Sequence, residues 1–386
     1  MRQERTGLFL FGACYKGTLK LFMLVAGLSG VLAAQERTVY VGTYTNGIYA
    51  NVTSKGIYTF RFDPSNGKTS EPILAAESSN PSFLAVHPNG RFLFAANENP
   101  NGTATAFSVG TEGRLSRLNS VSSRGSGPCY IAIDRTGKWL FAANYNSGSV
   151  AVFPIGADHT LGEASTVVQH SGSSVNPQRQ EGPHAHEVVV SADNGFVLVP
   201  DLGADKVVIY RFDAANGALG TPAFVKAAPG AGPRHLAFRP DGRFVYVLNE
   251  LAASIAAFRY DSGRLNELQT ISTLPADFAG AKSGAEIAVH PNGKFLYASN
   301  RGHDSIAIFS IDASKGTLTA AGHASTQGKT PRNFVIDPTG KYLLAANQDS
   351  GTVVIFRIDL NTGDLSPSGT VVQVPAPVSL AFGSIP

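Results

Sequence analysis

A sequence block that occurs six times constrains the fold of this 386-residue chain more than any other feature. Its clearest copy, HPNGRFLFAAN at residues 87–97, is a glycine turn followed by a short apolar strand that ends in Asn. The other copies occupy residues 134–144, 193–201, 239–249, 290–300 and 337–347, and the copy at 193–201 is the weakest. The turn glycines are 47, 58, 47, 51 and 47 residues apart. Such a period is typical of folds that repeat one supersecondary unit.

A second block, a short apolar strand ending in an aromatic residue, occurs seven times. The aromatic residues are Phe60, Phe107, Phe153, Tyr210, Phe258, Phe309 and Phe356. Each unit therefore contains an inner strand, a glycine turn, a second strand ending in Asn, a third strand ending in the aromatic residue, and a less regular fourth strand. Four strands in about 45 to 50 residues correspond to one propeller blade. The sequence predicts an all-β, seven-bladed β-propeller with four-stranded antiparallel blades.

The two ends of the repeat array are incomplete in complementary ways. The first recognisable strand, residues 38–45, matches the second strand of a unit, so its unit lacks an inner strand. Residues 378–383 supply an inner strand without a following unit. We expect both ends to build one shared blade, which closes the ring and leaves no unpaired sheet edge between the first and last units. A solenoid would not need this arrangement.

The formal net charge of +3 is carried entirely by residues 1–34, and the remainder of the chain sums to zero. Nucleic-acid binding therefore lacks its electrostatic basis. The basic segment is followed by an apolar run at 21–28 and by small residues at 31–34, the pattern of a secretory signal peptide. The apolar run is shorter than the ~20 residues that span a bilayer, which disfavours the alternative of a membrane anchor.

We therefore predict a signal peptide at 1–34 and a propeller domain at 35–386. The mature protein is expected to be periplasmic or secreted, without membrane attachment, and it would be cytoplasmic only if the segment is not a functional signal. Cys14 falls within the signal, so an exported chain would keep Cys129 alone and form no intramolecular disulfide.

The units differ at positions where side chains would surround one mouth of the central channel. Counting back five residues from each turn gives the start of each inner strand. These rim positions are Ser82, Cys129, His186, Arg234, Ala285, Arg332 and Val378. The second strands run antiparallel and return to the same mouth. The residues that follow their terminal Asn are Glu98, Tyr145, Leu202, Glu250, Arg301 and Gln348.

Charged residues converge on this mouth although only 15% of the chain is charged. We predict a functional pocket formed by His184, His186, Arg234, Glu250, Arg301 and Arg332, with Glu98 as a further candidate. The alternative is a solvated loop surface without function. The repeated asparagines are interpreted as structural, capping strand-to-loop turns. Cys129 is interpreted as a packing residue rather than a nucleophile.

Four segments carry a resemblance to a known family: RQEGPHAH at 179–186, GPRH at 232–235, LNE at 248–250 and SNR at 299–301. Over residues 38–384 the chain resembles the bacterial lactonase family of seven-bladed propellers, typified by one class of 6-phosphogluconolactonase. A fungal carboxymuconate lactonising enzyme looks like a distant relative. The proposed active site of that enzyme implies catalytic roles for His186, Arg234, Glu250 and Arg301, with His184 as the competing histidine.

The reaction expected from the resemblance is hydrolysis of a small, anionic lactone. Glu250 or His186 would take a proton from water and return it to the ring oxygen, while Arg234 and Arg301 stabilise the oxyanion or hold a phosphate or carboxylate. His184, Arg332 and Glu98 are predicted to bind substrate. We expect no cofactor and no metal, because the arginines would repel a cation and the two histidines lack a third ligand. Two alternatives remain open: a binding propeller without chemistry and a muconate-type cycloisomerase.

Overall fold

The computed structural model describes residues 36–46 and 53–383, all of which belong to one compact unit, residues 34–386. The predicted signal peptide at 1–34 lies outside the described residues. Within the described ranges, no helix is long and apolar enough to cross a membrane. The only helical element of the described residues is the short 3-10 turn η1 (Thr111–Gly113).

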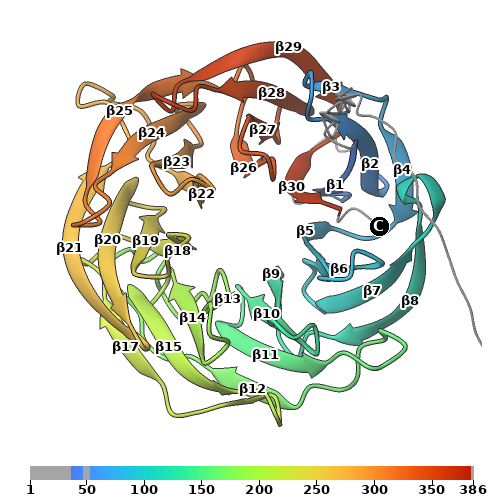
Figure 1. Ribbon diagram of the computed structural model, residues 1–386. Helices are drawn as coiled ribbons and strands as arrows, with labels where there is room; N and C mark the ends of the chain where they lie inside the picture. The colour runs from blue at the N-terminus through green and yellow to red at the C-terminus, as the bar shows by residue number, and fades with distance from the viewer. Residues whose placement is uncertain (1–35, 47–52, 384–386) are drawn as a thin grey trace, which may run out of the picture. The chain divides into compact units, whose positions relative to one another are not determined.

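Seven antiparallel sheets radiate from a central channel, as Figure 1 shows. The innermost strands are β5 (Pro81–Val86), β9 (Pro128–Ile133), β13 (Val189–Val190), β18 (Pro233–Phe238), β22 (Gly284–Val289), β26 (Pro331–Ile336) and β30 (Pro377–Phe382). The second strands are β1 (Arg37–Thr43), β6 (Phe92–Asn97), β10 (Trp139–Asn144), β14 (Phe196–Asp201), β19 (Phe244–Asn249), β23 (Phe295–Asn300) and β27 (Tyr342–Asn347).

The two outer positions of each blade complete the sheets. The third strands are β2 (Gly56–Asp63), β7 (Thr103–Val109), β11 (Ser149–Pro154), β15 (Lys206–Asp213), β20 (Ser254–Asp261), β24 (Ser305–Ile311) and β28 (Thr352–Ile358). The outermost strands are β4 (Ile73–Glu77), β8 (Leu115–Ser122), β12 (Thr166–Gln169), β17 (Ala223–Lys226), β21 (Arg264–Ser272), β25 (Leu318–Ser325) and β29 (Leu365–Gln373). Two blades carry an additional short outer piece, β3 (Lys68–Thr69) or β16 (Ala218–Leu219).

The predicted shared blade is confirmed. β1 pairs with β2 on one side and with β30 on the other, and Val39 lies opposite Phe382 across the β1–β30 ladder. The first blade therefore takes its inner strand from the C-terminal end of the chain. Figure 1 shows the red β30 beside the blue β1, which closes the ring.

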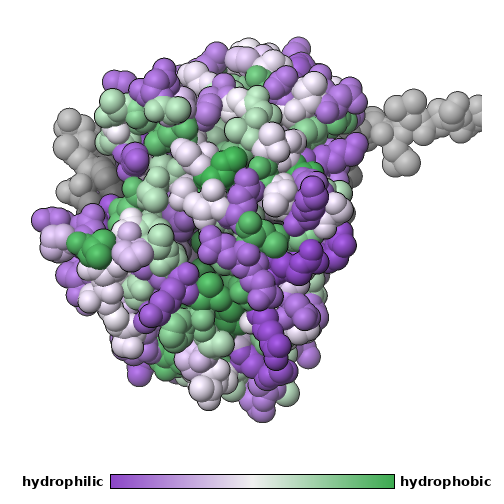
Figure 2. All heavy atoms as spheres, turned by 90° about the vertical axis from the view of Figure 1, so that its left-hand side faces the viewer, coloured by the Kyte–Doolittle hydropathy of each residue, from purple (hydrophilic) through white to green (hydrophobic). Residues whose placement is uncertain are grey.

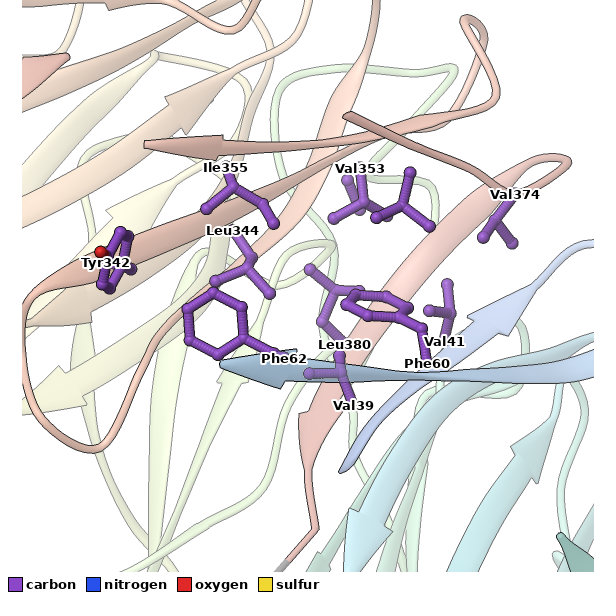
Figure 3. Packing of buried hydrophobic residues seen from close by; sticks show 12 residues of the cluster. Val39, Val41, Phe60, Phe62, Tyr342, Leu344, Val353, Ile355, Val374 and Leu380 are labelled. Carbon is purple, nitrogen blue, oxygen red and sulfur yellow. The ribbon is translucent and has the colours of Figure 1, made fainter. Parts of the chain in front are cut away.

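Each pair of neighbouring blades buries an apolar layer between its two sheets. At the junction of the first and last blades, Val39, Phe62 and Leu380 pack against Tyr342 and Ile355, as Figure 3 shows. The Phe62 and Tyr342 rings meet edge to face with centroids 5.3 Å apart. Fully burying such a side chain contributes roughly 1.5 to 3 kcal/mol. The outermost strands β21 and β25 are mostly exposed, and on their side of the ring hydrophilic and hydrophobic residues are interspersed (Figure 2).

The repeated asparagines are structural, as predicted, and hydrogen bonds of four of them, Asn97, Asn144, Asn249 and Asn347, bridge their own turns to a Ser or Thr. Most of the asparagines also connect neighbouring blades. Their side-chain amides donate to carbonyl groups just beyond the outer strand of the preceding blade. The pairs are Asn97 to Ser79 at 2.7 Å, Asn144 to Ser123 at 3.0 Å, Asn300 to Thr273 at 2.8 Å and Asn347 to Thr326 at 3.0 Å. In the fourth blade Asp201 takes this position and pairs with His170 of the preceding blade at 2.7 Å. These hydrogen bonds hold neighbouring blades together at the level of the channel mouth.

Candidate active site

A cavity of about 400 Å³ opens at the mouth where inner strands begin and second strands end. Five of the seven predicted site residues line it: Glu98, His186, Glu250, Arg301 and Arg332. Most of the residues placed at one mouth by their distance from the turn glycines therefore share this cavity. Arg234 and His184 occupy other positions, described below.

Glu250 is the centre of the charged cluster. It follows β19, and its side chain is only 4% exposed. One carboxylate oxygen, Oε1, accepts a hydrogen bond from Arg179 Nη2 at 2.7 Å. The other, Oε2, lies 3.0 Å from Arg234 Nε and 2.9 Å from Arg301 Nη2. A single buried carboxylate is thus shared by three arginines from three different segments.

The arginines decide the ionisation of Glu250. Burial alone would raise the pKa of this carboxyl and is the largest single influence. The combined charges of Arg301, Arg234 and Arg179 outweigh it and lower the pKa to about 2. Glu250 is therefore ionised at neutral pH, and a carboxylate with such a low pKa is a weak proton acceptor. Its geometry suits it to orienting arginines.

Arg234 lies one layer below the cavity instead of lining it. Its side chain is 3% exposed, and Nη1 donates to the backbone carbonyl of Ala285 on β22. Burial, together with the nearby charges of Arg301 and Arg332, lowers the pKa of Arg234 to about 10, so it remains charged at neutral pH. It contacts Glu250 but does not reach the open cavity. The expectation that Arg234 touches a lactone directly therefore needs correction.

His186 lines the cavity at the start of the fourth blade's inner segment. Its backbone N–H donates to the Pro200 carbonyl at 3.0 Å, and Nδ1 lies 3.7 Å from the Cys129 sulfur. Within the described chain, Nε2 makes no hydrogen bond, which leaves this nitrogen available to a ligand in the cavity. Burial and the charges of Arg234 and Arg332 hold the pKa of His186 well below 6.5. The imidazole is therefore neutral at neutral pH.

His184 is not among the residues that line the cavity. Its ring stacks on Tyr145 with centroids 4.4 Å apart, and its Nδ1 bonds the Tyr145 backbone carbonyl at 2.8 Å. The backbone N–H of His184 donates to Asp201 Oδ1, which fixes the segment. The His186 side chain therefore reaches the cavity, whereas the His184 side chain supports Tyr145 from behind.

Six lining residues were not assigned to the site from the sequence: Asn99, Pro100, Tyr145, Asn146, Arg179 and Ser283. Arg179 belongs to the long connection between β12 and β13, which has no counterpart in other blades. Its Nη2 also donates to Tyr145 Oη at 3.2 Å. The 58-residue interval between two turn glycines was the signal that marked this insertion.

Cys129 lines the same cavity, but its thiol is protonated. Burial, with Glu98 nearby, raises the pKa of this cysteine far above its ordinary value. The sulfur lies 3.3 Å from the His186 carbonyl oxygen and 3.8 Å from that of Ala185. A buried thiol that faces carbonyl oxygens is a poor nucleophile, so the interpretation of Cys129 as a packing residue stands.

A second layer of inner-strand residues, one position further along each strand, closes the channel beneath the site. We call this layer the channel plug; its members are Phe83, Tyr130, Glu187, His235, Glu286, Asn333 and Ser379. His235 Nδ1 lies 3.0 Å from Glu286 Oε1, and Asn333 donates to Glu286 Oε2 at 2.5 Å. The space that remains between the plug and the cluster above it is about 10 Å³.

At three blade boundaries a plug side chain also accepts a hydrogen bond from a backbone N–H of the next blade. Glu187 accepts from Leu236 N at 2.5 Å, and Asn333 accepts from Leu380 N at 2.9 Å. Ser379 Oγ accepts from Leu84 N at 3.2 Å. Among the described residues, no group of three or more His, Cys, Asp or Glu side chains is placed to hold a metal ion.

The fold and this site define a class of protein: a seven-bladed propeller with an arginine-rich cavity at one mouth of its channel. The sequence matches the family model described as "Lactonase, 7-bladed beta-propeller" over residues 38–382. The chain belongs to this lactonase family, and the prediction of a lactone hydrolase is confirmed at that level.

Named relatives agree with the family assignment. A 6-phosphogluconolactonase of Bacillus subtilis is 37% identical over 300 residues, which cover 77% of this chain and 84% of the relative. The solved structure of a Pseudomonas aeruginosa periplasmic gluconolactonase, PpgL, is 37% identical with a TM-score of 0.86, covering 91% of this chain and 100% of that one. A solved structure from Bacteroides fragilis is 41% identical with a TM-score of 0.84, covering 90% of this chain and 98% of that one.

Proposed function

We propose that this protein hydrolyses a sugar lactone of the 6-phosphogluconolactone type in the cavity beside Glu250 and His186. The observation that carries the proposal is the shared carboxylate of Glu250, which holds the Arg179, Arg234 and Arg301 side chains in place. Preorganised guanidinium groups stabilise negative charge that develops on a carbonyl oxygen during acyl transfer. The similarity to a named 6-phosphogluconolactonase supports the choice of substrate.

In the proposed mechanism His186 is the proton acceptor. Its neutral imidazole takes a proton from water through Nε2 as the water attacks the lactone carbonyl. Arg301, which lines the cavity, stabilises the oxyanion, and Arg234 acts through Glu250 from below. The imidazolium then returns the proton to the ring oxygen as the carbon–oxygen bond breaks. Because the pKa of His186 lies well below 6.5, its protonated form is a strong acid for that step.

We assign Glu250 the role of positioning the arginines, in place of the catalytic base considered from the sequence. Glu98 accepts a hydrogen bond from Tyr44 Oη at 2.9 Å, and Arg332 lies with its guanidinium carbon 5.3 Å from the Tyr44 ring centre. These two residues form the opposite wall and are proposed to bind the sugar hydroxyl groups. His184 acts only through Tyr145.

The test is a coupled assay of lactone hydrolysis, corrected for spontaneous opening, with wild type and Glu250→Gln. Loss of the carboxylate charge releases the arginines, and we expect kcat to fall about 10²- to 10³-fold. A folded Glu250→Gln variant with wild-type kcat would contradict the proposed arrangement. Wild-type protein that hydrolyses no lactone in a panel would favour the non-catalytic binding propeller.

We also propose that the protein acts outside the cytoplasm, after removal of residues 1–34. The charge and apolar pattern of that segment supports export, and one solved relative is named a periplasmic gluconolactonase. Cell fractionation and N-terminal sequencing of the native protein test this proposal. We expect a mature chain that begins near Ala34 or Gln35, whereas a cytosolic chain that retains Met1 would contradict export.

A further inference from the structure

The three arginines around Glu250 are held in different ways. Arg234 and Arg301 each also donate to a backbone carbonyl of the β22 region, that of Ala285 or Gly284. Their side chains are 3% and 15% exposed. The Arg179 side chain is 41% exposed, and among the described residues it is hydrogen-bonded by the side chains of Glu250 and Tyr145 alone. Two arginines are therefore fixed parts of the wall, and the third reaches in from solvent.

The backbone beneath Arg179 is rigid although its side chain is exposed. The neighbouring Gln180 is completely buried, and its Nε2 donates to the Leu202 carbonyl at 2.9 Å. The backbone N–H of Gln180 donates to the Asn176 carbonyl at 2.7 Å, and its carbonyl accepts from Ser174 N at 2.9 Å. The guanidinium of Arg179 is therefore attached to a well-anchored backbone at the edge of the cavity.

Arg179 retains unused donors. A guanidinium carries five N–H groups, and both hydrogen bonds of Arg179 use Nη2. Within the described residues, its Nε and Nη1 have no hydrogen-bond partner. Because the cavity is lined by three arginines against two carboxylates, an additional negative group on a ligand would be matched by this charge excess.

We propose that Arg179 is the specificity-determining residue that selects lactones carrying an anionic group outside the ring, a phosphate or a carboxylate. Nη1, whose two N–H groups have no partner among the described residues, donates to an oxygen of that group, while Nη2 remains on Glu250. A charge-assisted hydrogen bond from a guanidinium suits both anions. This inference rests on the proposed lactone hydrolysis and adds the residue that distinguishes charged from neutral substrates.

The experiment compares three substrates: a gluconolactone with a 6-phosphate, a sugar lactone with an exocyclic carboxylate, and neutral gluconolactone. The variants are Arg179→Gln and Arg179→Lys. We expect Arg179→Gln to lower the ratio of kcat/KM for phosphorylated over neutral lactone about 10- to 100-fold, mostly through KM, because charge-assisted hydrogen bonds are lost. Arg179→Lys keeps the charge but has a single nitrogen, which cannot stay on Glu250 and reach the anion at the same distance, so it should restore only part of the ratio. The carboxylate substrate shows which anion fits better.

The matched control is Arg124→Gln. Arg124 is an exposed arginine in the loop between β8 and β9, and the same loop bonds the cavity residue Asn99 through Gly127 N at 3.0 Å. Arg124 does not line the cavity, so its removal should change the substrate ratio less than twofold. An equal loss in both variants would indicate general electrostatic attraction and would overturn the assignment of Arg179.

Binding of the hydrolysis products separates this inference from the proposed function. Isothermal titration with 6-phosphogluconate and gluconate needs no turnover. If wild type hydrolyses lactones but Arg179→Gln keeps the wild-type preference for the phosphorylated product, the role of Arg179 is wrong and the lactonase proposal stands. Wild type could instead show no hydrolysis but prefer the phosphorylated product, with that preference lost in Arg179→Gln. In that case the role of Arg179 stands and the lactonase proposal is wrong.

Discussion

Two consecutive layers of the inner strands, the rim positions and the channel plug, use similar residue types for opposite purposes. In the plug each polar side chain is bonded to a neighbouring blade: His235 with Glu286, Glu286 with Asn333, and Asn333 with the backbone of Leu380. In the layer above, His186 has an open nitrogen and the cluster around Glu250 borders a cavity. A buried polar network that is satisfied internally stabilises the ring, whereas one that is left open can bind and react.

The same contrast appears in ionisation. Burial and the proximity of Glu286 raise the pKa of Glu187 in the plug well above its ordinary value, which favours its neutral form. Glu250 above it is just as buried, yet its arginines keep it charged. Two equally buried carboxyl groups therefore differ in role: Glu187 serves the fold, and Glu250 organises the site. Four predictions test this division.

The largest effect is expected from His186→Gln, which removes the proposed proton acceptor but keeps a side chain of similar length. We expect kcat for lactone hydrolysis to fall about 10²- to 10⁴-fold, with circular dichroism unchanged. The measurement is a coupled assay at several substrate concentrations. If kcat stays within threefold of wild type, His186 is not the proton acceptor of the reaction.

Glu286→Ala tests the plug. The change leaves His235 and Asn333 without their partner, and each buried unsatisfied group costs about 1 to 3 kcal/mol. We expect the free energy of unfolding in urea to fall by about 2 to 5 kcal/mol, while kcat per folded molecule changes less than threefold. The control is Glu187→Gln, in which an amide replaces a carboxyl group whose neutral form is favoured; it should cost about 1 kcal/mol or less. Equal costs would remove the distinction between the two carboxyls.

The pH dependence of kcat follows from the state of His186. The imidazole accepts a proton only when neutral, and its folded-state pKa is lowered well below 6.5. The base is therefore available at pH 6.5 and above, and it is lost only as the pH falls toward the lowered value. We expect a flat profile from pH 6.5 to 8 and a decline of about tenfold per unit on the acid side of the pKa. An acid midpoint at or above 6.5 would contradict this assignment.

The smallest effect is expected from Cys129→Ala, although Cys129 lines the cavity. Its thiol is protonated and contacts carbonyl oxygens, so it contributes packing alone. We expect kcat within about threefold of wild type and a loss of about 1 kcal/mol in unfolding free energy. A loss of activity beyond tenfold would reopen a covalent mechanism, and mass spectrometry of a trapped acyl-enzyme would decide it.

The periodic features of the fold could be predicted from the sequence, because they repeat. The seven aromatic-ended strands indicated seven blades, and the incomplete units at both ends indicated the β1–β30 pairing. Counting from the same turns placed His186 and Arg332 at one mouth. The depth of each side chain could not be read in this way: Arg234 occupies a rim position, but its guanidinium turns down toward Ala285.

Features that occur once in the chain were the ones that counting missed. Arg179 lies on an insertion, and a repeat alignment offers no counterpart from which to place it. His184 and His186 carry the same chemistry two residues apart, and only the stacking on Tyr145 shows which one faces away. The ionisation of Glu250 depends on three arginines from distant segments, which no local pattern brings together.

The pairing of β1 with β30 sets a condition on the order of events during synthesis. Val39 finds its partner Phe382 only after nearly the whole chain has been made. At about 5 to 20 residues per second, the first blade waits roughly 20 to 70 seconds for its last strand. Until then the ring is a gapped arc whose end blades expose strand edges. The ring can therefore close only after the C-terminal residues that form β30 have been synthesised.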